Sequence, residues 1–104
     1  MNATAQDKEG FLRDRSQWNP DVATALAAEA GIELTETHWL VLHLARDFYA
    51  RTGLSPEMRP LVKIVREALG PDTGSSIGLM QLFPPNPAKQ VARIGGLPKP
   101  TNCL

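Results

Sequence analysis

The sequence predicts a mainly helical protein, a compact bundle of about five helices, and three observations support this prediction. Between residues 20 and 94, apolar side chains recur three and four positions apart, the spacing that gathers them on one face of a helix. Residues that favour helix starts precede these segments, and glycine or proline follows them. The chain has 104 residues, enough for one modest hydrophobic core and too few for two.

The first predicted helix covers residues 20 to 30. Asn19 fits the N-cap, and Pro20 fits the first helical position, where a backbone N–H is not needed. Gly31 is a natural C-terminal stop. Residues 1 to 9 are polar and lack periodicity, so we expect a flexible N-terminus before the helical domain.

The second predicted helix is capped by Thr35 and runs from Glu36 to about Arg51. Its apolar residues cover more than half of the circumference, so we expect it to be the central and most buried helix. These residues are Trp39, Leu40, Leu42, Leu44, Ala45, Phe48 and Tyr49.

The third predicted helix starts at Ser55 and Pro56 and runs to Leu69. Away from its apolar face lies a basic stripe, which we treat as a candidate partner-binding surface. The stripe consists of Arg59, Lys63 and Arg66.

A short turn that contains glycine, residues 52 to 55, joins the second and third helices and predicts a helix-turn-helix element. DNA binding is therefore an alternative function. Against it, 11 Lys and Arg balance 11 Asp and Glu, so the protein has little general attraction for phosphates.

Two short helices complete the bundle. The fourth covers residues 77 to 83 and is stopped by the two prolines that follow. The fifth begins at Asn86 and Pro87, which repeat the cap and first-turn proline, and ends at the glycine pair 95–96. The helical domain thus spans residues 10 to 94.

Residues 95 to 104 form a predicted mobile C-terminal arm. Proline fixes φ and favours extended geometry in the preceding residue, so the arm is semi-rigid and could reach roughly 25 Å. Its expected pivot is Gly95 and Gly96, and its stiffeners are Pro98 and Pro100.

Composition and motifs argue against several classes of function. No apolar run approaches the roughly 20 residues of a membrane span, and the N-terminus lacks the apolar region of a signal peptide, so we expect a cytosolic protein without membrane contact. His38 and His43 are not spaced to share a metal, and no Cys-x-x-Cys pair occurs, so we expect no metal and no other cofactor.

Cys103 is the only cysteine and is the penultimate residue. A thiol on a mobile arm can enter the active sites of two different proteins, as a sulfur carrier requires. Lys99 would favour its thiolate, which the terminal carboxylate opposes. Together with the basic stripe, Lys99 is also a candidate partner-binding residue. The alternative is an incidental cysteine in a frayed tail.

The arm sequence Gly96-Leu97-Pro98-Lys99-Pro100, followed by Cys103, closely resembles that of the DsrC/TusE family of sulfur carriers. The likeness covers nearly the whole chain from Gly10 onward. It includes Gly10-Phe11-Leu12, Ser16-Gln17-Trp18, His38-Trp39, Arg46-Asp47-Phe48-Tyr49, Ser55-Pro56, Arg59, Leu61-Val62-Lys63, Leu82-Phe83-Pro84 and Pro87-Ala88-Lys89-Gln90.

The resemblance implies a helical bundle with a helix-turn-helix element, a small N-terminal β-hairpin and a flexible arm. It also implies that Cys103 bears sulfur as a persulfide. Members of the TusE type receive sulfur from a partner complex and pass it to an enzyme that thiolates the wobble uridine of certain tRNAs. Contact with tRNA is then expected only through the partner.

Two departures from the family pattern matter. Ala92 stands where the DsrC type, which works with dissimilatory sulfite reductase, has a second arm cysteine, and this favours the single-cysteine, TusE-like branch. Residues 1 to 9 lack the usual apolar residues of the first hairpin strand, so we expect an incomplete ribbon. The alternative is a DsrC-like partner or regulatory subunit of sulfite reductase or sulfur-oxidation enzymes.

Overall fold

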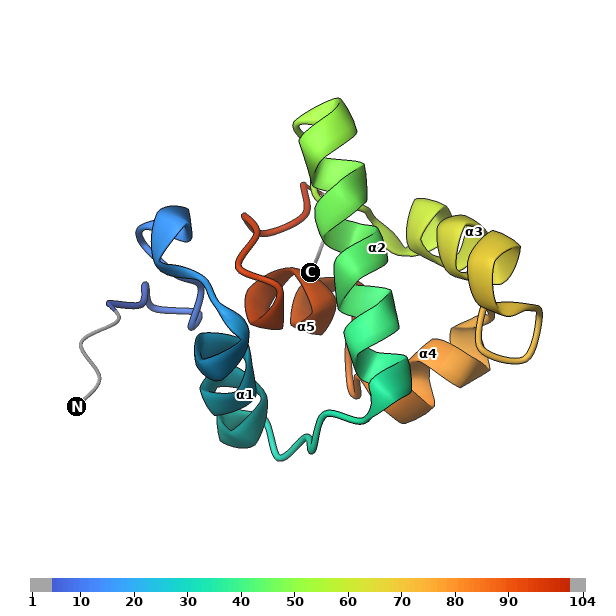
Figure 1. The fold of residues 1–104 in the computed structure, drawn as a ribbon, viewed down its shortest axis with the longest axis horizontal. Helices are drawn as coiled ribbons and strands as arrows, with labels where there is room; N and C mark the ends of the chain where they lie inside the picture. Colours follow the sequence, from blue (N-terminus) through green and yellow to red (C-terminus); the bar gives the residue numbers. More distant parts are fainter. Residues whose placement is uncertain (1–4, 102–104) are drawn as a thin grey trace.

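Figure 1 shows the computed structural model of the chain, which describes residues 5–101. In this range a short 3-10 turn precedes five α-helices, which confirms the predicted mainly helical bundle. None of these helices is both long and apolar enough to cross a lipid bilayer. The elements are η1 (Arg15–Gln17), α1 (Pro20–Glu29), α2 (Glu36–Thr52), α3 (Met58–Leu69), α4 (Ser76–Leu82) and α5 (Pro87–Ile94).

Most helices begin at the caps that the sequence predicts. The Asn19 side chain accepts the backbone N–H of Val22 at 2.8 Å, and the Asn86 side chain accepts that of Lys89 at 3.4 Å. Each bond satisfies a first-turn donor that has no acceptor within its own helix. Local sequence therefore sets where α1 and α5 begin.

His38 links the start of α2 to the end of α4. Its ring is buried, and its Nδ1 accepts the backbone N–H of Thr35 at 3.1 Å, which completes the capping box of α2. Because Nδ1 accepts, Nε2 carries the proton and donates to the carbonyl of Leu82 at 2.8 Å. The contact gives this histidine a structural role.

The start of α3 differs from the prediction, since the helix begins at Met58 and not at Ser55 and Pro56. Pro60 provides the reason. In a helix that started at Pro56, Pro60 would lie beyond the first turn, where each residue donates its backbone N–H to a carbonyl of the same helix, and proline has no N–H to donate. With Met58 as the first residue, Pro60 lies in the first turn, where no intrahelical donor is required.

The helix at the centre of the packing is α5, and the expectation that α2 would be the most buried is wrong. Five of the eight residues of α5 are buried, against four of the seventeen of α2. Figure 1 shows α5 behind α2, and it packs against all four other helices. The small side chains of Ala88 and Ala92 allow this close approach, whereas Leu40 of α2 is 43% exposed.

The N-terminal segment forms a turn and then enters the core. The expected ribbon is reduced to one antiparallel bridge between Gln6 and Leu12, and no strand occurs between residues 5 and 101. The Asp7 carboxylate accepts the backbone N–H groups of Glu9 and Phe11 at 2.9 and 3.0 Å. The bond from Phe11 lowers the pKa of Asp7. Residues 5–9, expected to be flexible, thus make defined contacts.

Candidate functional site

The candidate site is the C-terminal arm, of which the structure describes Gly95 to Thr101. Cys103 lies outside the described residues, whereas both pivot glycines and both stiffening prolines lie within them. The described part therefore defines how the arm is attached. Among residues 5–101, no group of three or more His, Cys, Asp or Glu side chains could hold a metal ion.

The two glycines terminate α5 in a Schellman motif. Gly96 has a φ of 72°, the left-handed conformation that glycine adopts most readily. Its N–H bonds to the carbonyl of Arg93 at 3.3 Å, and the N–H of Leu97 bonds to that of Ala92 at 2.8 Å. Both glycines are buried. A pivot at these residues therefore requires the motif to open.

Two side chains hold the carbonyls at the end of α5, and we call them the Arg46–Trp18 clamp. The Trp18 indole N–H donates to the carbonyl of Ile94 at 2.8 Å, and Arg46 Nη1 donates to that of Gly95 at 2.6 Å. The Arg46 guanidinium lies 3.8 Å from the centroid of the Trp18 ring, within cation–π distance. Burial lowers the pKa of Arg46, although an arginine remains charged. The clamp sets the direction in which the arm leaves the domain.

The rest of the described arm contacts the domain at two further points. Ser55 Oγ, in the turn between α2 and α3, donates a hydrogen bond to the carbonyl of Pro98. Lys99 Nζ lies 2.9 Å from Glu9 Oε2, and this hydrogen bond is the main cause of the lowered pKa of Glu9. Pro100 is buried. Lys99 is thus directed toward the N-terminal turn.

The basic stripe is exposed along α3, as its spacing predicts. Leu61 and Val65 point into the core from the opposite face. Within the described chain no ion pair involves Arg59, Lys63 or Arg66. Their charges are therefore accessible, and their role in partner binding stays a prediction.

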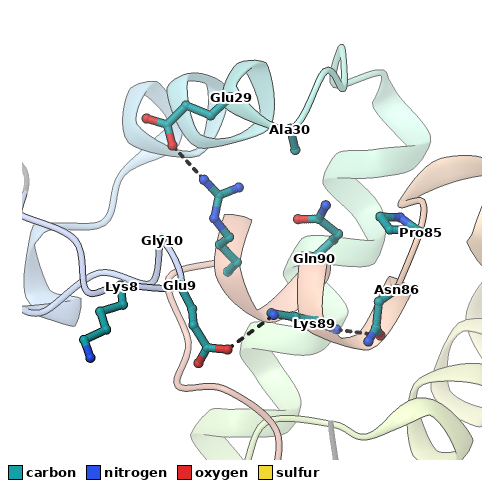
Figure 2. Close-up of a pocket in the computed structure, with 10 residues that line it drawn as sticks. Lys8, Glu9, Gly10, Glu29, Ala30, Pro85, Asn86, Lys89 and Gln90 are labelled. Carbon is teal, nitrogen blue, oxygen red and sulfur yellow. Dashed lines mark hydrogen bonds and ion pairs between the residues drawn. The ribbon is translucent and has the colours of Figure 1, made fainter. Parts of the chain in front are cut away.

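A pocket lies between the N-terminal turn, α1 and α5, and Figure 2 shows its lining. Its cavity volume is about 590 Å³. Lys89 pairs with Glu9 at 3.4 Å, and Arg93 pairs with Glu29 at 2.6 Å. Carboxylates of the same chain thus offset part of the positive charge of this pocket.

Sequence reasoning did not identify Trp18, Arg46 or Glu9 as residues that hold the arm. For Arg46 a signal existed, because a charged residue follows Ala45 within the apolar band of the predicted second helix. Trp18 and Arg46 also lie in segments that carry the family resemblance. No local pattern pairs them with the end of α5.

The described residues form a helical bundle whose C-terminal arm is attached at the end of its central helix, and the sequence places its only cysteine on that arm. The chain belongs to the family described as DsrC like protein, whose model matches residues 1–104. The predicted family is therefore confirmed.

Relatives of known name cover most of the chain. A sulfurtransferase TusE homolog of Haemophilus influenzae is 50% identical over 98 residues, 94% of this chain and 90% of the relative. Sulfurtransferase TusE of Escherichia coli is 44% identical over the same shares.

Solved structures have the same fold. The solution structure of Allochromatium vinosum DsrC has a TM-score of 0.86 and 42% identity, over 97% of this chain and 90% of that one. The oxidized gamma-subunit of the dissimilatory sulfite reductase (DsrC) from Archaeoglobus fulgidus has a TM-score of 0.85 and 40% identity, over 97% and 92%.

Proposed function

We propose that this chain is a carrier-type sulfurtransferase that accepts sulfur as a persulfide on Cys103 and passes it to a partner, in a relay for 2-thiolation of the wobble uridine of tRNA. The observation that carries this proposal is the similarity to proteins named sulfurtransferase TusE over 94% of the chain. The only cysteine of the chain lies on the arm that the family shares. We place this relay in the cytosol.

The transfer consists of two thiol-exchange steps. The Cys103 thiolate attacks the terminal sulfur of a donor persulfide, a new S–S bond forms, and the donor leaves as a thiolate. An acceptor thiolate then attacks the terminal sulfur of the Cys103 persulfide and releases the Cys103 thiolate. Each step exchanges one S–S bond for another, so no external oxidant or reductant is needed.

The partners of this proposal are a sulfur-donor protein complex and a sulfur-accepting enzyme, a tRNA thiolase. Contact with tRNA occurs through that enzyme. Gly95 and Gly96 act as the pivot, and Pro98 and Pro100 keep the arm extended while it enters a partner. Movement of the distal half of the arm requires release of both the Ser55 hydrogen bond and the Lys99–Glu9 pair.

A second candidate is a subunit or regulatory role in a sulfite reductase-type enzyme. It is favoured by the similarity to the DsrC structure described as a gamma-subunit of that enzyme. Ala92 argues against it, because the second arm cysteine of the DsrC type is missing here. Without that thiol, Cys103 has no partner for an internal disulfide.

The deciding experiment begins with protein that has been reduced and freed of reductant. It is incubated with a persulfide-bearing donor protein, and the mass of the intact protein is then measured by mass spectrometry. Wild type should gain one sulfur atom, and the Cys103→Ser variant should gain none. Incubation of the loaded protein with a tRNA thiolase or a sulfite reductase then separates the two candidates, because only the true acceptor removes the added sulfur. Stable donor-dependent sulfur on the serine variant would refute the role of Cys103.

A further inference from the structure

A shallow groove lies between the C-terminal end of α2 and one side of α3. It has a cavity volume of about 550 Å³. We call it the α2–α3 groove, and its lining residues are Phe48, Arg51, Arg59, Pro60, Lys63, Ile64 and Glu67.

The rim of the groove carries a net positive charge, because three cations and one carboxylate, that of Glu67, line it. Arg51, Arg59 and Lys63 are exposed, and none takes part in an ion pair within residues 5–101. By contrast, Lys89 and Arg93 on α5 are each paired with a carboxylate. Three cations against one carboxylate give this groove a local positive field, on a protein that has no net charge.

The uncharged part of the groove lining is apolar. Phe48, Pro60 and Ile64 are only half-buried, so apolar surface stays accessible between the cations. Leu54, in the turn that connects the two helices, is 61% exposed. An apolar surface gains nothing from a nucleic-acid phosphate, whereas it can bury an aliphatic or aromatic side chain of a protein.

The groove is also close to the arm. Ser55 lies in the turn between the two helices that form the groove, and it holds Pro98 of the arm. From Ser55 to Arg59 the chain can span at most about 14 Å, and from Pro98 to Cys103 at most about 17 Å. A partner seated in the groove therefore lies within reach of the thiol.

From these observations we infer that the α2–α3 groove is the docking site for an acidic protein segment that carries an apolar anchor side chain. The segment belongs to the sulfur donor or acceptor. Only this last assignment rests on the proposed relay, because the binding itself does not involve Cys103. The acidic residues pair with the rim, and the anchor covers Phe48 and Ile64.

The test uses the full-length reduced protein and a fluorescent synthetic peptide of sequence Asp-Glu-Phe-Leu-Asp-Glu. The expected result is saturable binding that weakens at high salt and shifts the amide resonances of Phe48 and Ile64. Lys63→Glu should weaken binding about tenfold, because an attraction becomes a repulsion. Lys8→Glu changes the net charge equally, far from the groove in sequence, and should leave binding unchanged. Circular dichroism checks that both variants fold.

Two control peptides separate the components of the groove. Replacing Phe-Leu by Ser-Ser tests the apolar surface, and replacing the acids by their amides tests the rim; both peptides should bind more weakly. Arg66→Glu, on α3 but outside the lining, should weaken binding less than Lys63→Glu. Equal effects of these two variants would mean that the exposed stripe, and not the groove, attracts the peptide, which overturns the inference.

Two further outcomes would overturn it. One is the absence of peptide binding to wild type, and the other is tighter binding of a DNA duplex or a tRNA at the same resonances. Sulfur loading of Cys103 is measured separately on the same variants. Peptide binding therefore tests the groove, and sulfur loading of Cys103 tests the relay, so that either hypothesis can be refuted without the other.

Discussion

Replacing Arg46 by methionine should lower the free energy of unfolding by about 2 kcal/mol. The guanidinium donates to the Gly95 carbonyl at 2.6 Å and lies 3.8 Å from the centroid of the Trp18 ring. Methionine retains an apolar stem of similar shape but has no donor and no charge. The substitution therefore leaves the buried Gly95 backbone without the donor that Arg46 provides.

The magnitude follows from the two interactions that are lost. A hydrogen bond from a charged donor contributes about 1.5–3 kcal/mol, and a partly desolvated cation–π contact about 0.5–2 kcal/mol. Desolvation of the guanidinium, whose burial lowers the pKa of Arg46, offsets part of this gain. Arg46 is only half-buried, so water also screens its interactions. The net loss of about 2 kcal/mol corresponds to a fall in Tm of about 10 °C for a domain of this size.

Urea unfolding followed by circular dichroism measures the loss, and amide hydrogen exchange locates it. Exchange should rise at Gly96 and Leu97 more than in α3. Arg51→Met, an exposed arginine of the same helix, should change stability by less than about 0.5 kcal/mol. Trp18→Phe keeps the aromatic ring but loses the indole N–H, so it should cost about 1 kcal/mol. If Arg46→Met were as stable as wild type, or if exchange rose equally throughout α3 and α5, the clamp would not hold the arm.

Three other predictions test contacts around the arm and the core. Gly31 and Gly96 both have positive φ, so alanine costs about 1 kcal/mol at either position. At Gly96 the added Cβ would also collide with the Trp18 ring, so Gly96→Ala should lower stability more than Gly31→Ala. Equal losses of stability in calorimetry would contradict this collision. Lys99 lowers the pKa of Glu9, so their pairing should stabilise the arm fully above the ordinary carboxyl pKa of 4.5. This stabilisation should be lost as the pH falls through the lower pKa that Glu9 has in the folded protein. Glu9→Gln should make proteolysis of the arm independent of pH in this range. His38→Gln keeps a capping box but loses the hydrogen bond to the carbonyl of Leu82 at the end of α4, so it should lower stability by about 1–2 kcal/mol. Amide exchange should rise in α4 more than in α2. A similar rise in both helices would argue that His38 does not link them.

The sequence by itself determined the features that depend on neighbouring residues. Asn19 and Asn86 cap helices where their spacing predicts, because an N-cap bonds to an N–H only two or three positions away. The number of helices, the amphipathic face of α3 and the single arm cysteine are likewise readable from short intervals. The family resemblance added what local patterns do not give, namely the expected bundle fold of the whole chain and the expected role of the arm cysteine.

Only the tertiary structure decided which helix is central and what holds the arm. These features depend on contacts between residues that are distant in the chain. Trp18 bonds to a carbonyl 76 positions away, and Arg46 to one 49 positions away. A periodic pattern can place both side chains on a helix face or in a turn, but it does not specify their acceptors. Those acceptors are selected when the core closes, because burial requires each polar group to find a partner within reach.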